Sequence, residues 1–488
     1  MEGIMRDINA NPGPEERKCI PKKMLKKLFS YQIPHVERLV EILSTKFVAL
    51  DASDTGTGKT YVTAAICKIL GLQPVIICPK TIMISWDRVL ESFGVQIYDT
   101  VNYETIRRCN MYSDDNYILR EMSSYISNNK DRNGDPDGYF YNWDLPKNTI
   151  VVFDEAHRCK SPTSANGKLL ISTKQLIQKK IPVLLLTATI CEKFEDMKIP
   201  FILFRLIPSY RNYAEYVRFV CRRYPELKPD RSSYDDMSKY EIDVANSKML
   251  IIYKVIVDYT ARIKISELGD MFPENQCCAQ EYFVKNHKDI SEKYKKIRRL
   301  AMKYNAQQDK SIFVLPKLQK MKQEIELLKV PIFIEQTEIF LEAGFSVIIF
   351  VNFIDTLNVI SGHLNTQCLI YGEQKIEDRQ ANIDSFQSNT SKLIICQIRA
   401  GGIGIGLHDV HGGHPRVSLI NCPESATDLK QALGRAARSG AKTPVFQKII
   451  CAANVSHEKK TMDNVNRKLD NLSAINDGDI GNYTIETV

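Results

Sequence analysis

The stretch DASDTGTGKT, residues 51–60, comes close to the phosphate-binding pattern G-x-x-x-x-G-K-[ST], but Ser53 stands where the pattern has its first glycine. Gly56 and Gly58 can adopt backbone conformations that residues with a Cβ atom resist, so successive N–H groups can turn inward around a phosphate. A glycine-rich turn that only happens to spell these letters is the alternative. Ser53 alone does not decide between the two.

The residues on either side of this loop have the strand, loop and helix order that the motif requires. KFVALD (46–51) is a short apolar run typical of a strand, and KTYVTAAICKIL (59–70) has helical spacing that would direct a helix N-terminus at a nucleotide. Lys59 would supply the charge for the β- and γ-phosphates, and the Thr60 hydroxyl would hold Mg²⁺. The residues expected to contact ATP are Thr55, Gly56, Thr57, Gly58, Lys59 and Thr60.

Composition bounds the class of protein. A chain of 488 residues, 44% apolar and 25% charged, is ordinary for a soluble globular protein of two or three domains. No membrane span and no export signal is apparent, so we expect an intracellular protein, nuclear or cytoplasmic, that is not secreted. Its 13 cysteines include no C-x-x-C pair and are predicted to be reduced thiols.

Apolar strand candidates alternate with helical stretches in two separate blocks, which predicts two α/β units with mainly parallel sheets. We expect a first lobe over residues 1–220, a mainly helical basic insertion and linker over 221–330, a second lobe over 331–455 and a tail over 456–488. The first block contains KFVALD, PVIICP, TIVVFDE and IPVLLLTAT; the second contains SVIIFVN, CLIYG, KLIICQ, VSLINC and VFQKIIC.

The basic residues are concentrated in the middle of the chain. The whole chain has a net charge of +8, and residues 285–329 alone carry thirteen Lys or Arg against five Asp or Glu. Two stretches in this segment have helical periodicity, and their basic faces are either nucleic-acid contacts or solvated surface.

The run IVVFDEAHRCK (150–160) places two carboxylates at the C-terminal end of a buried strand, where ligands bind in open α/β sheets. Asp154 would hold Mg²⁺, and Glu155 would orient and activate the attacking water. A D-E pair can also cap a strand end, but D-E-A-H together with GTGKT favours an ATPase.

In this combination the chain resembles a superfamily-two helicase or translocase and is most similar to the Snf-type (Swi/Snf-like) DNA-dependent ATPases. The resemblance runs in order over most of the length, through FSYQIPHVERL, ICPKTIMISWDRV, VNYETIRR, DEAHRCKSPTSANGKLL, LLLTATI, DYTARIKISEL, SVIIFVNFIDTLNVI, YGEQKIEDRQANIDSFQ, QIRAGGIGIGLHD and QALGRAARSGAK. It implies two RecA-like lobes, ATP and Mg²⁺ as cofactors, and a nucleic acid, double-stranded DNA above all, as partner.

The resemblance also implies roles for residues outside the phosphate loop. Gln32 would recognise adenine, and Lys80 and Trp86 would mark a contact with the nucleic-acid backbone. The remaining residues implied for nucleotide binding, catalysis or coupling are Thr187, Thr189, Arg399, Gly402, Gly404, Gln431, Arg435 and Arg438. Gln431, Arg435 and Arg438 have spacings of four and three, so on one helix they would face the same way across a cleft and bring positive charge to the γ-phosphate.

Three features depart from the Snf-type pattern or qualify it. The chain has TATI where the family usually has T-G-T-P, a form closer to true helicases and viral relatives. Superfamily-two loops commonly lack the first glycine, so Ser53 is compatible with a working site. No chromatin-targeting module is recognisable, and the Asn-, Ile- and Lys-rich sequence is compatible with a large DNA virus, where host cell or virion would be the location.

Three functions stay open. The first is an ATP-driven translocase on double-stranded DNA, which would read phosphates. The second is a strand-separating DNA or RNA helicase, suggested by TATI and DEAH. The third is a nucleic-acid-binding subunit of a transcription or packaging complex, with transcription or chromatin proteins as partners; the intact Lys59, Glu155 and Arg438 argue against a vestigial ATPase.

Overall fold

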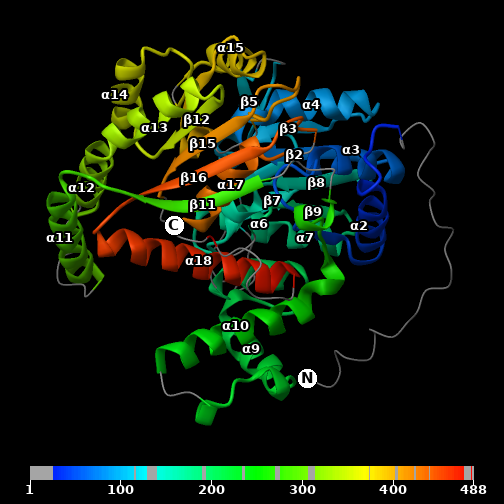
Figure 1. Cartoon of the computed structure of the whole chain (residues 1–488). Coiled ribbons are helices and arrows are strands. Elements are labelled where there is room, and N and C mark those ends of the chain that lie inside the picture. The colour runs from blue at the N-terminus through cyan, green and yellow to red at the C-terminus, as the bar shows by residue number, and fades with distance from the viewer. Residues whose placement is uncertain are drawn as a thin grey trace.

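The computed structural model contains two α/β lobes, each built on a six-stranded sheet (Figure 1). All strand pairs within these two sheets are parallel, which confirms the two RecA-like lobes expected from the sequence. The structure describes residues 26–114, 117–128, 140–189, 194–233, 237–269, 275–305, 314–372, 374–401, 405–422, 425–438, 440–477 and 485.

The sheet of lobe one has the strand order β10-β1-β9-β8-β2-β3. Its strands are β1 (Val48–Asp51), β2 (Gln73–Cys78), β3 (Asp99–Asn102), β8 (Thr149–Asp154), β9 (Val183–Leu186) and β10 (Thr260–Ala261). Its helices are α2 (Gln32–Lys46), α3 (Lys59–Leu70), α4 (Met83–Ser92), α5 (Tyr103–Ile106), α6 (Ala165–Ser172), α7 (Lys174–Gln178), α8 (Lys198–Leu203), α9 (Tyr213–Cys221) and α10 (Met237–Ile256). Two small antiparallel pairs form separate two-stranded sheets: β4 (Asn110–Tyr112) with β5 (Arg120–Met122), and β6 (Ile126–Asn128) with β7 (Tyr141–Trp143).

The sheet of lobe two has the order β11-β16-β15-β12-β14-β13. Its strands are β11 (Asn275–Tyr282), β12 (Ser346–Val351), β13 (Leu369–Ile370), β14 (Leu393–Gln397), β15 (Arg416–Asn421) and β16 (Val445–Ala452). Its helices are α11 (His287–Asn305), α12 (Val314–Leu328), α13 (Val330–Glu342), α14 (Ile354–Leu364), α15 (Ile376–Gln387), α16 (Ile398–Gly401), α17 (Ala426–Ala436) and α18 (Ser456–Asp477).

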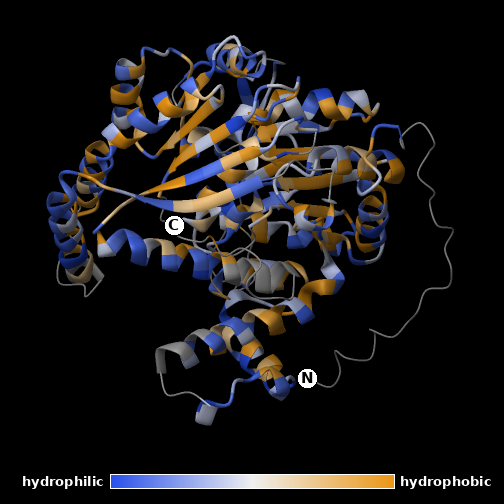
Figure 2. Ribbon diagram, viewed as in Figure 1, coloured by the Kyte–Doolittle hydropathy of each residue, from blue (hydrophilic) through white to orange (hydrophobic). Residues whose placement is uncertain are grey.

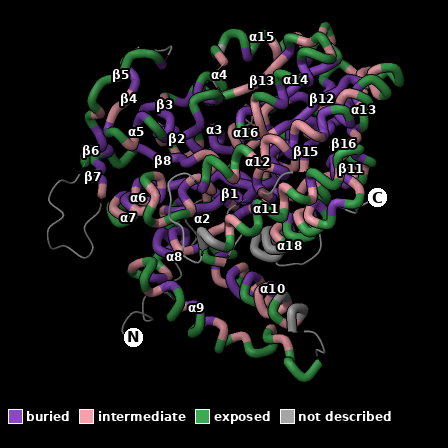
Figure 3. The backbone as a smooth tube through the Cα atoms, turned by 90° about the vertical axis from the view of Figure 1, so that its left-hand side faces the viewer, coloured by how far each residue is buried: buried purple, intermediate pink, exposed green. Residues whose placement is uncertain are grey.

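Apolar strands in both sheets form the cores of the lobes. Every residue of β1, β9, β12 and β15 is buried, as expected for parallel strands with helices on both faces. Figure 2 shows β12 mainly in the hydrophobic colour and α11 largely in the hydrophilic one. In Figure 3 the strands are buried, and the helices around them have exposed outer faces. No described helix is long and apolar enough to cross a membrane.

The segment expected to be a mainly helical insertion contributes one strand to each sheet. β10 pairs with β1 in lobe one, and β11 pairs with β16 in lobe two. The chain therefore passes from the first sheet to the second between Ala261 and Asn275. The domain boundaries at residues 221 and 331 stay predictions.

The basic part of this segment forms a pair of helices, α11 and α12, that is fixed to lobe two by buried charges. The Lys329 ammonium donates to Glu458 Oε1 at 2.9 Å, and both side chains are almost fully buried. Glu326 in α12 accepts hydrogen bonds from the backbone N–H groups of Asn352 and Phe353 at the start of α14. These contacts hold the helix pair against the C-terminal ends of β12 and β16.

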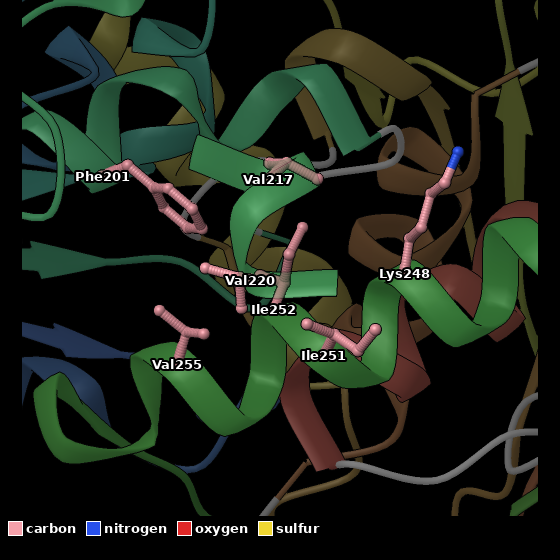
Figure 4. Close-up of a pocket in the computed structure, with 7 residues that line it drawn as sticks. All are labelled: Phe201, Val217, Val220, Lys248, Ile251, Ile252 and Val255. Atoms are coloured by element: carbon pink, nitrogen blue, oxygen red, sulfur yellow. The ribbon is translucent and has the colours of Figure 1, made fainter. Parts of the chain in front are cut away.

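A second helical extension, α9 and α10, packs beside α8 on lobe one. Its apolar side chains surround a small cavity that lies apart from the phosphate loop (Figure 4). The lining residues are Phe201, Val217, Val220, Lys248, Ile251, Ile252 and Val255. The cavity brings no cluster of polar groups together, so it is packing space within the helical extension.

Candidate active site between the two lobes

The phosphate loop joins β1 to α3 and has the backbone that its glycines predict. Gly56 and Gly58 have φ angles of 89° and 88°, in the left-handed region that favours glycine. A Cβ atom on Gly58 would lie 2.3 Å from Gln32 Nε2, so the loop also needs glycine here for close approach. The cradle therefore has the shape that binds phosphate through backbone N–H groups.

Ser53, in the place of the first glycine, is fully buried and ties the loop to its surroundings. Its hydroxyl lies 3.2 Å from His35 Nε2 in α2 and accepts a hydrogen bond from the Ile263 backbone N–H at 3.0 Å. His35 Nε2 also lies 3.2 Å from Asp51 Oδ1. A serine at this position thus connects the loop to α2 and to the inter-lobe linker, contacts that a glycine would not make.

The other loop residues are placed as expected around this cradle. Gln32 is buried and donates from Nε2 to the Thr57 carbonyl oxygen at 2.8 Å, while its Oε1 accepts from the Phe29 backbone N–H. The Thr57 hydroxyl donates to the Asp54 carbonyl oxygen. Lys59 Nζ donates to the carbonyl oxygens of Ser53 and Asp54 at 2.8 and 3.0 Å, at the start of α3 where Thr60 follows.

Asp154 and Glu155 stand at the C-terminal end of β8, opposite the phosphate loop. Asp154 accepts a hydrogen bond from Trp86 Nε1 at 2.9 Å and one from the Glu155 backbone N–H. Burial, with the nearby Glu155 carboxylate adding to it, raises the pKa of Asp154 above that of an ordinary aspartate. Glu155 itself has a φ of 56°, in the left-handed region.

Trp86 requires a correction. The sequence resemblance implied a contact with the nucleic-acid backbone, but the Trp86 side chain is only 1% exposed and its indole N–H faces Asp154. The reason is that α4 packs against α3 and β3 with Met83, Trp86 and Leu90 buried, which turns Trp86 into the core beside the end of β8. Trp86 is therefore a positioning residue for the carboxylate.

A chain of side-chain contacts runs from lobe two through the carboxylates into lobe one. Gln431 Nε2 donates to Glu155 Oε2 at 3.2 Å, and His157 Nδ1 lies 3.3 Å from the same oxygen. His157 Nδ1 also lies 3.1 Å from the Thr187 hydroxyl, which accepts from the Thr189 backbone N–H. Thr187 and Thr189 are buried. Through His157 they are linked to Glu155, so a movement of the Glu155 carboxylate can be transmitted to them.

Helix α17 of lobe two lies directly on the phosphate loop. A Cβ atom on Gly434 would lie 1.9 Å from Thr55 Oγ1, and one on Gly56 would lie 3.2 Å from Arg438 Cγ. Arg438 requires a second correction, because α17 ends at Ala436 and Ala437 has an extended backbone. Arg438 therefore reaches the loop from beyond the helix, and it does not share a helical face with Gln431.

Arg435 is buried below the loop and bonded within its own lobe. Its guanidinium donates to the carbonyl oxygens of Gln431 and Ile405, and Arg438 donates to the same Ile405 oxygen. Burial, together with the charge of Arg438, lowers the pKa of Arg435 to about 9, while Glu155 and Asp154 act in the opposite direction. Arg435 thus stays charged near neutral pH and lies within electrostatic reach of both carboxylates.

The candidate nucleic-acid contacts are exposed. Lys80 follows β2, with its ammonium 5.9 Å from the Tyr112 ring centre. The Arg399 side chain is 86% exposed and lies 3.8 Å from Asp428. On α11 the basic side chains of Lys295, Lys296, Arg298 and Arg299 are all exposed. Gly402 and Gly404 lie outside the described residues.

The residues present fit ATP with Mg²⁺. Hydroxyl and carboxylate oxygens are the ligands that Mg²⁺ prefers, and Thr60 and Asp154 would provide them beside a cradle that a Cβ atom would fill. The sequence did not reveal three further residues of the site, His35, Asp54 and His157. Asp54 and His157 lie within recognised motifs, the phosphate loop and D-E-A-H, whereas His35 had no signal in the sequence.

Comparisons with known proteins agree with this geometry. Residues 25–192 match the family described as "Type III restriction enzyme, res subunit", and residues 329–440 match "Helicase conserved C-terminal domain". The chain is 51% identical over 475 residues to a putative ATP-dependent RNA helicase of Acanthamoeba polyphaga mimivirus, covering 96% of this chain and 88% of the relative.

Two solved structures are among the similar ones. The SWI2/SNF2 ATPase core of Sulfolobus solfataricus in complex with dsDNA is 17% identical, with a TM-score of 0.33 and coverage of 90% of each chain. Dbp5 of S. cerevisiae bound to RNA and ADP BeF3 is 14% identical, with a TM-score of 0.45 and coverage of 96% of this chain and 94% of that one.

Proposed function

Because the chain belongs to the superfamily-two helicases, which are nucleic-acid-dependent ATPases, we propose that it hydrolyses ATP in order to move along double-stranded DNA. The observation that carries the ATPase part of the proposal is the contact between Gln431 of lobe two and Glu155 of lobe one. Because of this contact, both lobes contribute residues to the ATP site. Hydrolysis therefore depends on the position of one lobe relative to the other.

Each residue of the joint site has a task that its position supports. Lys59 and the backbone of the phosphate loop bind the phosphates on lobe one. Glu155 orients the attacking water and accepts its proton, and Gln431 fixes the direction of that carboxylate. Arg438, whose stem lies against Gly56, stabilises the charge that develops on the γ-phosphate. Thr60 and Asp154 would hold Mg²⁺, which would neutralise part of the phosphate charge.

Closure and reopening of the lobes turn this chemistry into movement. Lobe one carries Lys80, and lobe two carries Arg399 and the basic helix α11. When the lobes approach and separate, one set of phosphate contacts shifts relative to the other. Movement along the nucleic acid follows if the two sets hold it with different strength at each stage.

Duplex DNA is favoured by the sequence segments that are most specific. DEAHRCKSPTSANGKLL and QALGRAARSGAK resemble Snf-type ATPases, and the candidate contacts are positively charged groups suited to phosphates. The similarity to a mimivirus protein supports a viral origin, in which case the motor would work inside the infected host cell or be carried in the virion.

A strand-separating RNA helicase is the second candidate. It is favoured by the name of the viral relative and by TATI at residues 187–190, the form closer to true helicases. Such an enzyme would use the same ATP site, so the two candidates differ only in the polymer they grip and in what happens to its strands.

The deciding experiment measures ATP hydrolysis by the full chain with duplex DNA, single-stranded DNA and RNA in turn. We expect the largest stimulation with duplex DNA, displacement of a third strand from a triplex, and no net unwinding of a tailed duplex. Stronger stimulation by RNA, or efficient unwinding of the tailed substrate, would favour the second candidate. Glu155→Gln is the control, because it should show neither hydrolysis nor displacement.

A further inference from the structure

Asp54, a buried carboxylate in the phosphate loop, contacts both the inter-lobe linker and lobe two. Its Oδ1 lies 3.2 Å from Arg262 Nη2 in the linker and 3.0 Å from Lys430 Nζ in α17 of lobe two. Its Oδ2 accepts a hydrogen bond from the Ile265 backbone N–H at 3.1 Å. A single side chain thus joins the phosphate loop, the linker and the opposite lobe.

The cluster is almost closed to solvent. The side chains of Asp54, Arg262 and Lys430 are 8%, 8% and 9% exposed. Burial alone would raise the pKa of Asp54, but the charges of Lys430 and Arg262 hold it well below its usual range. The Asp54 carboxylate is therefore ionised near neutral pH.

Lys430 begins a regular row of contacts along the loop. Lys430, Gly434 and Arg438 are spaced four residues apart and meet the consecutive loop residues Asp54, Thr55 and Gly56. On the helix, residues four apart lie on one face, which explains the first two contacts. The row fixes how far α17 is shifted along the loop.

We propose that Asp54 and Lys430 form a latch between the lobes, which sets the register of α17 and so positions Gln431 and Arg438 for hydrolysis. This proposal rests on the proposed function, because it concerns the same ATP site. The two residues are positioning residues. A shift of α17 by one residue along the loop would take Gln431 away from Glu155, so the pair acts on turnover through the residues beside it.

The two cations have different roles in the latch. Arg262 belongs to the linker, which is bonded to lobe one through Ala52 and Asp54, so it stays with Asp54 when the lobes separate. Lys430 moves away with lobe two and gains water in exchange. Asp54 is never left as an unpaired buried anion, which would be strongly unfavourable, so the latch can open in every cycle.

The test uses Lys430→Met, which keeps the length of the side chain and removes its charge. With ATP and the nucleic acid that best stimulates the wild type, we expect single-turnover hydrolysis to fall about tenfold, within the usual range of coupling between sites. ATP binding to lobe one should be nearly unchanged. A fluorophore pair, one on each lobe, should report less closure with ADP and beryllium fluoride. Lys430→Arg should restore most of both properties.

Two controls separate the latch from a general effect. Lys392→Met removes an exposed lysine of the same lobe, ahead of β14, and should leave closure and hydrolysis unchanged. Asp54→Asn combined with Lys430→Met should be no worse than Asp54→Asn alone. Normal closure in Lys430→Met, or a Lys430→Arg variant as impaired as Lys430→Met, would overturn the proposal. Failure of duplex DNA to stimulate the wild type would overturn only the proposed substrate.

Discussion

Gln431 Nε2 and Glu155 Oε2 lie 3.2 Å apart, although one belongs to helix α17 of lobe two and the other to the end of β8 in lobe one. The same carboxylate oxygen lies beside His157, which in turn contacts Thr187. The Glu155 carboxylate is therefore contacted from both lobes.

Replacing Arg438 or Arg435 with alanine should reduce turnover severely and spare ATP binding. Arginines that stabilise the transition state of phosphoryl transfer contribute on the order of 10³ to 10⁵ in rate. Lys59→Ala should instead weaken binding itself, because Lys59 belongs to the phosphate loop, and Glu155→Gln should bind ATP and keep the lobes closed. Equilibrium ATP binding and single-turnover hydrolysis would be compared in saturating DNA. Near-normal hydrolysis in both arginine variants would rule out α17 and its extension as the source of the charge.

Gly434→Ala should block the approach of α17 to the phosphate loop. The added Cβ atom would lie 1.9 Å from Thr55 Oγ1, far inside contact distance, so the lobes could close only with a shift. We expect turnover to fall at least tenfold, with ATP binding to lobe one little changed. Gly362→Ala is the matched control, because that glycine lies in helix α14 with nothing within 4 Å of its added Cβ. Equal activity of the two variants would contradict close packing at Gly434.

Trp86→Phe should move the acid limb of the activity profile to higher pH. In the proposed mechanism Asp154 acts as a carboxylate. Its raised pKa means that the charged form is lost as the pH falls through a value above that of ordinary aspartate. The Trp86 N–H stabilises the charged form, so its removal raises the pKa further, by up to about one unit. The required Mg²⁺ concentration should rise too. Rates measured across pH at saturating ATP would check this, and an unmoved acid limb would separate Trp86 from catalysis.

Neutralising Lys295, Lys296, Arg298 and Arg299 together should weaken DNA binding. These side chains are exposed on α11, and each lost phosphate contact should reduce the salt dependence by about 0.9 log unit on duplex DNA. ATP affinity without DNA should hardly change, because α11 is remote from the phosphate loop (Figure 1). Binding measured over a series of salt concentrations provides the slope. An unchanged slope would mean that this basic face is only solvated surface.

The sequence predicted the interior of each lobe well and its edges poorly. All nine apolar stretches singled out as strands contain strands, because buried parallel strands are continuous apolar runs. Within the two six-stranded sheets, the missed strands β3, β10 and β11 all lie at the edges, where one side has no partner strand and polar residues are tolerated. The short antiparallel pairs β4-β5 and β6-β7 were missed as well. β11, with the sequence NQCCAQEY, is the clearest case, because its burial is mixed along its length.

Local motifs located the phosphate loop and the carboxylates, but they could not reveal contacts between distant segments. Helical spacing placed Arg438 on α17, whereas the helix ends two residues earlier. Trp86 was expected to mark a contact with the nucleic-acid backbone, but its side chain is buried, because a short motif does not show which face of a helix meets the core. Membership of superfamily two, expected from the order of the motifs, is confirmed by the viral relative. The assigned roles of single residues stay predictions.

The left-handed backbone conformation of Glu155 lowers the thermal stability of the protein. A φ of 56° is unfavourable for a residue with a Cβ atom by about 1–2 kcal/mol, whereas glycine accepts it at no steric cost. Glycine loses more chain entropy on folding, which costs roughly 0.5–1 kcal/mol. This cost is smaller than the backbone strain that glycine removes, so replacing Glu155 with glycine should still favour the folded state. Glu155→Gly should therefore melt at a temperature no lower than Glu155→Gln, although both are inactive. That result would mean that selection has retained a carboxylate at this turn although it makes the folded chain less stable.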